Sequence, residues 1–542
     1  MTNKNIKHFL VAGLVCCGMA TALTACSDWD DHYSGAGAAG GSNLTLWEQL
    51  KANNQVSDFC EVLEQTKVFR MHKKTSVSYA DLLNGGQSFT VVAPVNGTFN
   101  KDSLLQLVQT NQGDSVVEKF FVLNHLSRTL NSLTSEKKSM MLLNAKYVEM
   151  DGSTIEGVSV SQANCHAKNG VLHVVNSPLP YQYSIYEALC DMPELSTVGQ
   201  ALRLYDEDYF DADASVSSGI VDGVPVYIDS VTIERNRFLQ RIGLIAAEDS
   251  TYWVVAPKVE GWQKAWEEAL QYFQYDEKVQ KRDSIQHYWT THALMSDAVY
   301  NMTDQKSVND SLISVPYNRL EPEYHVFYKP FQSGGILSQA TPIECSNGIL
   351  YKTDEWPFTP EQTYFTELWS EGEQTALFAS EPKECSYTIR RLATDSISEG
   401  AYLNIIPRVA TSNWDISFRV NNTLSGTYDI CAIVLPKSVA NQVNPDLRPN
   451  KFKAYINYVD EAGEPQTFNC GNTQFTNNPE RVDTIVLAEA FHFPACNYDQ
   501  NDIKISVRLQ CSITTPQTAS YSREMYLDCI YLRPRTSKSE EQ

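Results

Sequence analysis

Residues capable of chemistry are sparse in this 542-residue chain, and they form no familiar catalytic pattern. The sequence contains no H-E-x-x-H, G-x-x-x-x-G-K-[ST], G-x-S-x-G or C-x-x-C motif. His125 and His292 each lie near the end of an apolar run and could act as a base or a metal ligand. Neither has the neighbouring partners that this chemistry requires, so we favour buried histidines bonded to the backbone. A motif search leaves a dispersed Ser/His/Asp triad open.

The densest charge cluster, Asp206 to Asp213, offers the oxygen ligands that calcium prefers. It lacks the turn glycine and the closing glutamate of an EF-hand loop, so we expect a solvated loop within an insertion, residues 204–236. A G-x-G-x-x-G pattern at Gly35 to Gly40 has no strand before it, which argues against a nucleotide site. We therefore predict no catalytic residue, no metal and no cofactor.

The N-terminus reads as an export signal. Lys4 and Lys7 precede an apolar run, Phe9 to Ala22, which is too short to span a bilayer. The following Leu-Thr-Ala-Cys26 resembles a bacterial lipobox, which implies a signal peptide over residues 1–25 and a lipid on Cys26. An ordinary secretory signal with an incidental cysteine is the alternative. Acyl chains at one terminus would anchor the protein without a spanning helix.

An acidic stretch, Ser27 to Asp31, follows this cysteine. It resembles the tag of Bacteroidetes lipoproteins that reach the outer face of the outer membrane, and a solvated linker is the alternative. Residues 34–42 contain only Gly, Ala and Ser, so residues 26–42 would form a lipidated, flexible tether. We expect a cell-surface outer membrane lipoprotein. The net charge of 43 − 65 = −22, without a basic patch, argues against nucleic-acid binding.

The central element of the chain is Phe89 to Pro94, whose β-branched and aromatic residues predict a buried strand. Pro94 should end that strand, and Asn96 should cap a helix whose apolar face begins at Phe99. Asn169-Gly170 is a strong turn signal that precedes a second apolar strand.

These landmarks, with Asn124-His125-Leu126 between them, resemble the fasciclin (FAS1) domain in their order and approximate spacing. The resemblance covers about residues 43–183. It implies an α+β fold and a role in adhesion without covalent chemistry. Pro94, Asn96, His125, Asn169 and Gly170 would then be structural motif residues.

The same order of signals returns later in the chain. Tyr252 to Pro257, Thr291-His292 and Asn347-Gly348 echo the first copy, as does Ser184 to Leu189. Repetition in one order predicts a second FAS1-like domain over residues 184–370. This copy departs from the family pattern, because no Asn follows two residues beyond Pro257. Its activity should not be assumed from the family.

Residues 385–535 change to short apolar runs separated by turn signals, which predict an all-β sandwich followed by a tail, 536–542. The pattern weakly resembles galactose-binding-like jelly rolls. Exposed aromatic rings in a sandwich can stack on sugars, and we single out Trp356, Trp369 and Trp414 without assigning any of them. The predicted fold is thus α+β, with two FAS1-like domains in tandem followed by a β-sandwich.

Asp followed by Ser or Thr recurs in a pattern that resembles the O-glycosylation acceptor of exported Bacteroidetes proteins. Capping and turn formation by these residue types is the equal alternative. The hydroxyl residues concerned are Ser103, Ser115, Ser230, Ser250, Ser284, Ser311, Ser396 and Thr484.

These observations favour a lipid-anchored surface protein that acts in adhesion or ligand binding and is not an enzyme. Its partner would be a surface protein or a glycan, and the sequence leaves its oligomeric state open. A first alternative is an accessory glycan-binding lipoprotein of a polysaccharide-uptake system. A second is a hydrolase with a dispersed active site.

Overall fold

The computed structural model describes residues 43–536, except 71–72, 222–223, 304–309, 316–323, 393, 395–396, 441–443 and 472–473. Cys26 and the predicted signal peptide and tether lie outside the described residues. The chain divides into two compact units, one with residues up to 182 and 209–233, the other with residues 183–208 and 234–542.

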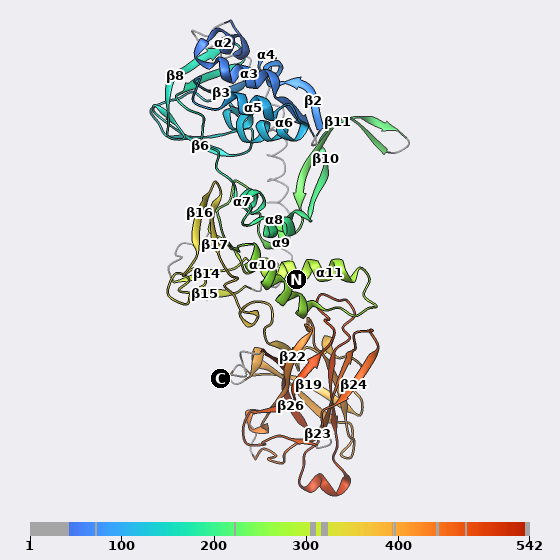
Figure 1. Ribbon diagram of the computed structural model, residues 1–542. Coiled ribbons are helices and arrows are strands. Elements are labelled where there is room, and N and C mark those ends of the chain that lie inside the picture. The colour runs from blue at the N-terminus through green and yellow to red at the C-terminus, as the bar shows by residue number, and fades with distance from the viewer. Residues whose placement is uncertain are drawn as a thin grey trace, which may run out of the picture. The chain divides into compact units, whose positions relative to one another are not determined.

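The first domain packs short helices against a seven-stranded sheet of order β4-β3-β9-β8-β7-β6-β5 (Figure 1). Its helices are α2 (Leu46–Ala52), α3 (Ser57–Gln65), α4 (Tyr79–Asn84), α5 (Lys101–Leu107) and α6 (Asn111–Val117). A π-helical turn (Glu118–Val122) and two 3-10 turns (Asn54–Val56 and Leu123–His125) complete the helical part. Its strands are β1 (Lys67–Arg70), β2 (Lys73–Ser78), β3 (Phe89–Pro94), β4 (Leu126–Ser127), β5 (Lys138–Met141), β6 (Tyr147–Asp151), β7 (Thr154–Ile155), β8 (Val158–Ala167) and β9 (Gly170–Val175).

The predicted central strand is confirmed as β3, which ends at Pro94 and is buried along its whole length. It runs parallel to β9, with Phe89 opposite Gly170 and Pro94 opposite Val175. Both strands are covered on two faces, which explains why each reads as a continuous apolar run rather than an alternating one.

Asn169 fixes the start of this parallel pair. Its Oδ1 accepts the Leu46 N–H at 2.7 Å, and its Nδ2 donates to the carbonyls of Leu83 (2.9 Å) and Gly85 (2.8 Å). Its own carbonyl accepts the N–H of Phe89 at 3.1 Å. A side chain at the next residue, Gly170, would collide with the Phe89 carbonyl, so glycine is required there by close approach.

Asn96 does not cap the helix that follows it, which corrects the prediction. Helix α5 begins later and is capped by Asn100, whose Oδ1 accepts the Ser103 N–H at 3.1 Å. Asn96 instead reaches back to the start of α3, where its Oδ1 accepts the Asp58 N–H at 2.9 Å. Its Nδ2 donates to the carbonyl of Asn54 at 2.8 Å. It therefore caps a helix that is distant in sequence, which local spacing cannot reveal.

The second domain repeats the central arrangement in a four-stranded sheet of order β13-β12-β17-β16, which matches β4-β3-β9-β8 in order and direction. Its helices are α7 (Ile185–Asp191), α8 (Ser196–Arg203), α9 (Leu239–Ile242), α10 (Val259–Leu270) and α11 (Arg282–Met295). Its sheet strands are β12 (Tyr252–Pro257), β13 (Val299–Asn301), β16 (Thr341–Cys345) and β17 (Gly348–Thr353), and a separate pair is β14 (Ser311–Ile313) and β15 (Val326–Tyr328).

Asn347 repeats the contacts of Asn169 atom for atom. Its Oδ1 accepts the N–H of Ile185 at 2.9 Å, and its Nδ2 donates to the carbonyls of Ile245 (2.9 Å) and Ala247 (2.8 Å). Its carbonyl accepts the Tyr252 N–H at 3.0 Å. The parallel register also repeats, because Tyr252 lies opposite Gly348. The two α+β domains thus share one design at the level of single hydrogen bonds.

The acidic cluster at 206–213 is not a loop, which corrects a second prediction. It lies in β10 (Asp206–Val221), which pairs with β11 (Val224–Asn236) in a two-stranded sheet. The prediction weighed the charge of the cluster and its departures from a calcium loop, and it left out the pairing of this segment with residues 224–236.

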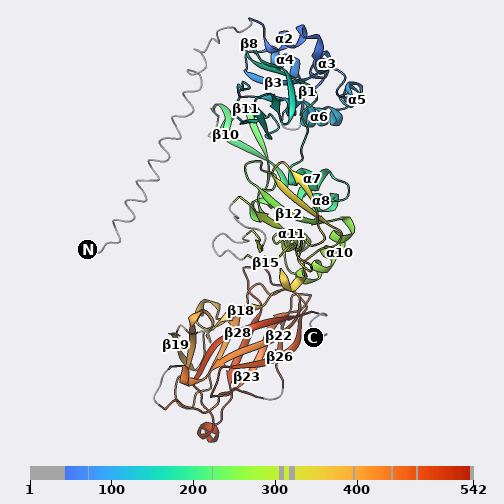
Figure 2. The same cartoon turned by 90° about the vertical axis from the view of Figure 1, so that its left-hand side faces the viewer.

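The C-terminal region is the predicted β-sandwich. One sheet has the order β19-β20-β28-β22-β26, with β18 added beside β28, and the other has the order β21-β27-β23-β24, with β25 beside β23 (Figure 2). The strands are β18 (Leu368–Glu371), β19 (Cys385–Arg391), β20 (Ala401–Pro407), β21 (Asp415–Arg419), β22 (Gly426–Leu435), β23 (Lys451–Val459), β24 (Pro465–Asn469), β25 (Phe475–Thr476), β26 (Asp483–Phe493), β27 (Ser506–Cys511) and β28 (Met525–Arg535). Because β18 pairs with β28, the sandwich begins before the predicted residue 385. Strand β18 therefore belongs to the sandwich, although the prediction placed residues up to 370 in the second domain.

We predict that Asn169→Ala and Asn347→Ala each destabilise their own domain by about 2–4 kcal/mol, because each leaves buried backbone groups without partners. Hydrogen exchange of backbone amides should report the loss of stability in the affected domain. The β9 amides in Asn169→Ala and the β17 amides in Asn347→Ala should exchange roughly 30-fold faster or more. The exposed residue Asn54 provides the matched control, since Asn54→Ala should change exchange little. Unchanged protection in β9 and β17 would contradict the structural role of the two amides.

Candidate functional site

The second domain and the sandwich share one hydrophobic core. Phe273, Tyr275 and Trp289 of the domain pack in the same cluster as sandwich residues such as Trp414 and Phe493. Burying aromatic side chains from two domains in one core opposes their separation. The two domains therefore form a rigid support for whatever lies at their junction.

Polar contacts surround this shared core. The Ser425 hydroxyl donates to the Gln271 carbonyl at 2.7 Å and accepts the Gln274 N–H at 3.1 Å. The Tyr275 hydroxyl donates to the Tyr498 carbonyl at 3.0 Å. An ion pair of 2.8 Å joins Lys504 to Asp276, whose side chain is buried. The junction is thus fixed by directional bonds as well as by apolar packing.

A cleft of about 810 Å³ lies at this junction. The second domain contributes Asp297 and His325 to its walls, and the sandwich contributes Trp369, Asn421 and Tyr498. This volume falls within the range of small-molecule binding sites. Because its walls come from both domains, the shared core determines its shape.

Trp369 is the most distinctive group in the cleft. Its side chain is 44% exposed, although it lies on a strand of the six-stranded sheet. Its ring stacks on Tyr531, directly opposite on β28, with centroids 4.7 Å apart and planes 12° from parallel. Tyr531 therefore supports one face of the indole ring and restricts its movement. Trp356 packs on Trp262, and Trp414 is buried, so neither offers a comparable platform.

His325 is held by a carboxylate in the same cleft. Its Nδ1 lies 2.8 Å from Oδ1 of Asp297, which is almost completely buried. The backbone of His325 is fixed as well, because its N–H donates to the Ser314 hydroxyl at 2.9 Å. Sequence spacing gave no signal for this pair, since the two residues lie on different segments separated by β13 and β14.

The two predicted core histidines are confirmed as buried. Nδ1–H of His125 donates to the Phe121 carbonyl at 2.7 Å, and Nε2 accepts the Leu179 N–H at 3.0 Å. Burial lowers the pKa of His125 to about 4. His292 lies among aromatic rings, and burial, followed by the charge of Arg241, lowers its pKa to about 3. Both imidazoles are neutral at physiological pH.

The predicted O-glycosylation residues differ in their exposure and do not gather in one region of the described structure. Ser103, Ser284 and Thr484 are exposed, whereas Ser115, Ser250 and Ser311 are half-buried. Ser396 and the side chain of Ser230 lie outside the described residues. The aspartate beside Ser115 is Asp114, which is fully buried and pairs with Lys74 at 2.6 Å, so a structural role explains that motif.

A cluster of carboxylates lies where β18 meets β28. Burial, followed by the charges of Glu371 and Glu373, raises the pKa of Asp528 to about 7. Burial also raises the pKa values of Glu371 and Glu373. One oxygen of each carboxylate is buried without a hydrogen bond within the described structure. These are oxygen ligands of the kind that hard cations accept, but no group of three or more His, Cys, Asp or Glu residues in the described ranges is arranged to hold a metal ion.

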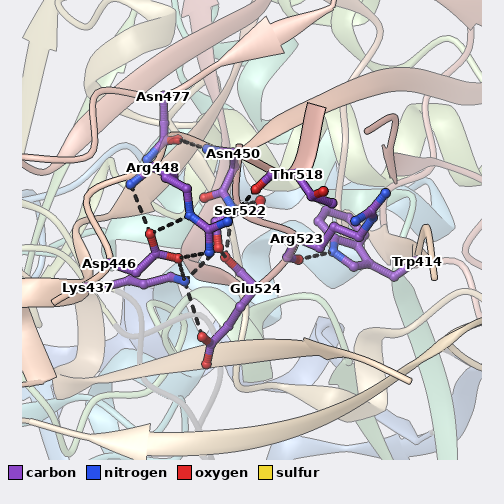
Figure 3. Close-up of polar contacts among 10 residues, drawn as sticks. All are labelled: Trp414, Lys437, Asp446, Arg448, Asn450, Asn477, Thr518, Ser522, Arg523 and Glu524. Carbon is purple, nitrogen blue, oxygen red and sulfur yellow. Dashed lines mark hydrogen bonds and ion pairs between the residues drawn. The ribbon is translucent and has the colours of Figure 1, made fainter. Parts of the chain in front are cut away.

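A second polar cluster surrounds the buried Lys437 of the sandwich (Figure 3). Its ammonium group donates to Ser522 at 2.7 Å, Asp446 at 3.1 Å and Glu524 at 3.2 Å. Arg448 binds the same Asp446 carboxylate, and this bond is the main cause that lowers the pKa of Asp446. All three donors of the ammonium group are used, so this cluster joins loops and offers no ligand site.

A comparison with protein families agrees with the fold of the first domain. Residues 63–181 match the family model of the fasciclin domain. The chain therefore contains a fasciclin (FAS1) domain, and the second domain repeats its central sheet. No curated protein sequence matches the chain. No helix among the described residues is long and apolar enough to span a membrane.

The similar solved structures include a FAS1 domain pair and carbohydrate-binding modules. A FAS1 domain pair from the insect cell adhesion molecule fasciclin I is 13% identical, covers 57% of this chain and 99% of its own, and has a TM-score of 0.19. A xylan-binding domain of carbohydrate-binding module family 22 is 10% identical, with coverage of 31% and 92% and a TM-score of 0.21. A family 11 module from Clostridium thermocellum bound to a mixed-linked tetrasaccharide is 13% identical, with coverage of 31% and 95% and a TM-score of 0.19. Scores this low carry no functional argument.

The carboxylate cluster predicts a pH dependence of stability. Asp528 holds its proton in the folded state at pH values where the unfolded chain has lost it, so stability should fall as the pH rises from about 4 to 7. Asp528→Asn removes this ionisation. We therefore expect it to unfold at a higher temperature than the wild type at pH 8, and by a smaller margin at pH 5.

Thermal unfolding in EDTA, where only protons can neutralise the cluster, measures this effect. Asp502→Asn is the matched control, because Asp502 is exposed in the same sandwich. A pH profile of Asp528→Asn that runs parallel to that of the wild type would contradict the prediction.

Lys437→Met should destabilise the sandwich by about 1–3 kcal/mol, because Ser522 and Glu524 lose their buried donor, whereas Asp446 keeps its ion pair with Arg448. Denaturant unfolding of the sandwich reports this loss. Arg408→Met is the control, since the Arg408–Glu384 pair is exposed and should contribute at most about 1 kcal/mol. Equal effects of the two substitutions would argue against a structural role for Lys437.

Proposed function

We propose that this protein is a lipid-anchored binding protein of the bacterial cell surface that acts in adhesion or ligand capture without covalent chemistry. The Leu-Thr-Ala-Cys26 sequence and the acidic residues after it support the anchor and its location. The fasciclin domain at 63–181 supports a role in binding. The same residues are the basis on which we propose a lipoprotein of the Bacteroidetes type.

One observation carries the proposal: an exposed, supported tryptophan faces a cleft whose walls are fixed by a shared core. Rigid walls lower the entropic cost of binding, since few side chains remain to be ordered. The fasciclin domains would then provide attachment and spacing, while the junction with the sandwich provides recognition.

The exposed Trp369 ring also favours the narrower alternative, an accessory glycan-binding lipoprotein of a polysaccharide-uptake system. Indole rings stack on the apolar face of sugars, and this residue lines the cleft while Tyr531 supports one face of its ring. Retention on a defined glycan would favour this alternative, whereas binding only to surface proteins would favour adhesion.

The Asp297–His325 pair is the one observation that favours the hydrolase alternative. A carboxylate on Nδ1 orients a histidine as it does in a Ser-His-Asp triad. Hydrolysis would additionally require a nucleophilic hydroxyl at Nε2 and donors for an oxyanion. Turnover of a glycan or ester by the wild type that is lost in His325→Ala would establish the enzyme and overturn the non-catalytic proposal.

The anchor gives a direct test of the proposal. Cys26→Ala should move the protein from the membrane fraction to the soluble fraction, because the acyl chains would have no acceptor. Cys17→Ala is the matched control, since it changes a cysteine in the apolar run and leaves Cys26 in place. Protease treatment of intact cells then tests surface exposure. Unchanged membrane retention of Cys26→Ala would refute the lipid anchor.

A further inference from the structure

We propose that the cleft between the second domain and the sandwich binds a neutral oligosaccharide, with one pyranose ring stacked on Trp369. This inference rests on the proposed binding function and names its ligand class. It goes beyond the fasciclin match, because residues 63–181 lie in the other compact unit and contribute nothing to the cleft.

The indole ring supplies the apolar part of the site. A sugar ring has one face of C–H groups, which gains from contact with the face of an aromatic ring. Trp369 is 44% exposed while Tyr531 covers its other side, so a single face is available for stacking.

The rim supplies the polar part of the site. The exposed residues Glu367, Gln374, Asn421 and Asn422 line the same cleft as Trp369. Amides and carboxylates can donate to and accept from the hydroxyl groups at the edge of a sugar ring. Asn422 is already positioned, because its Oδ1 accepts the Asp499 N–H at 3.2 Å. A flat apolar platform edged by such groups matches a pyranose better than it matches an apolar ligand.

The charges of the cleft select a neutral ligand. Two carboxylates, Asp297 and Glu367, line it, and no lysine or arginine is among its lining residues. The protein as a whole has a net charge of −22. A uronate-rich chain would bring further negative charge into this field, and no lysine or arginine lines the cleft to pair with it. We therefore infer a neutral oligosaccharide rather than an acidic polysaccharide.

Glycan affinity electrophoresis and calorimetry of the detergent-solubilised full chain test this inference. The probes are neutral glucan, xylan and mannan, with polygalacturonate as the acidic comparison. We expect wild-type protein to bind at least one neutral probe and Trp369→Ala to weaken that binding about tenfold or more. Trp369→Phe should retain most of the affinity. Tyr387→Ala is the matched control, because Tyr387 is 40% exposed on the same sandwich but lies outside the cleft.

Three outcomes would overturn the inference: no binding of a neutral glycan, equal binding by wild type and Trp369→Ala, or strongest binding of polygalacturonate. Vesicles that carry the lipidated protein separate this failure from failure of the proposed function. If Trp369→Ala vesicles still adhere to cell-surface protein, the binding role stands and the glycan site is wrong. If correctly displayed wild-type vesicles bind neither protein nor glycan, both proposals fail.

Discussion

A buried side-chain amide determines how each α+β domain is built. Asn169 and Asn347 each join a helix start, a preceding loop and the first residue of a parallel strand. Parallel strands cannot be joined by a tight turn, so their register has to be set by contacts between distant segments. The side-chain amide bonds the helix start through its oxygen and the loop through its nitrogen, and the backbone carbonyl of the same residue accepts the first strand N–H. The following glycine lets the strands approach closely. The rest of each domain depends on this register, because it decides which side chains enter the core.

In the second domain, helix α11 also packs against the sandwich. The C-terminal half of α11, Trp289 to Met295, is buried on every side. Leu294 and Met295 pack in the core of the domain, whereas Trp289 and Ala293 pack in the core of the sandwich. Without the sandwich, the face of α11 that carries Trp289 and Ala293 would be exposed to water. Because this face is apolar, the sandwich is an integral part of the folded unit rather than an appended module.

Features set by neighbouring residues could be predicted from the sequence, and features set by distant residues could not. Buried strands could be predicted at Phe89 to Pro94 and at Tyr252 to Pro257, because residue type and a terminal proline act locally. The predicted role of Asn96 as the cap of the following helix was wrong. Its hydrogen-bond partners precede it by about forty residues, and local spacing could not indicate them. The sequence singled out Trp369 but could not distinguish it from Trp414, because exposure depends on strand β18 meeting β28. The carboxylate cluster was missed for the same reason.

The location of the cleft follows from this architecture. Exposed faces of a sandwich can bind ligands alone, but a wall from a second domain encloses a ligand on more sides and excludes more water. Such a wall is useful only if it stays in place, and the shared core together with the Ser425 and Tyr275 hydrogen bonds provides that constraint. The same rigidity argues against a site that closes on its ligand. Recognition should therefore depend on the existing shape and charge of the cleft, in which one aromatic face, an amide rim and two carboxylates are already set.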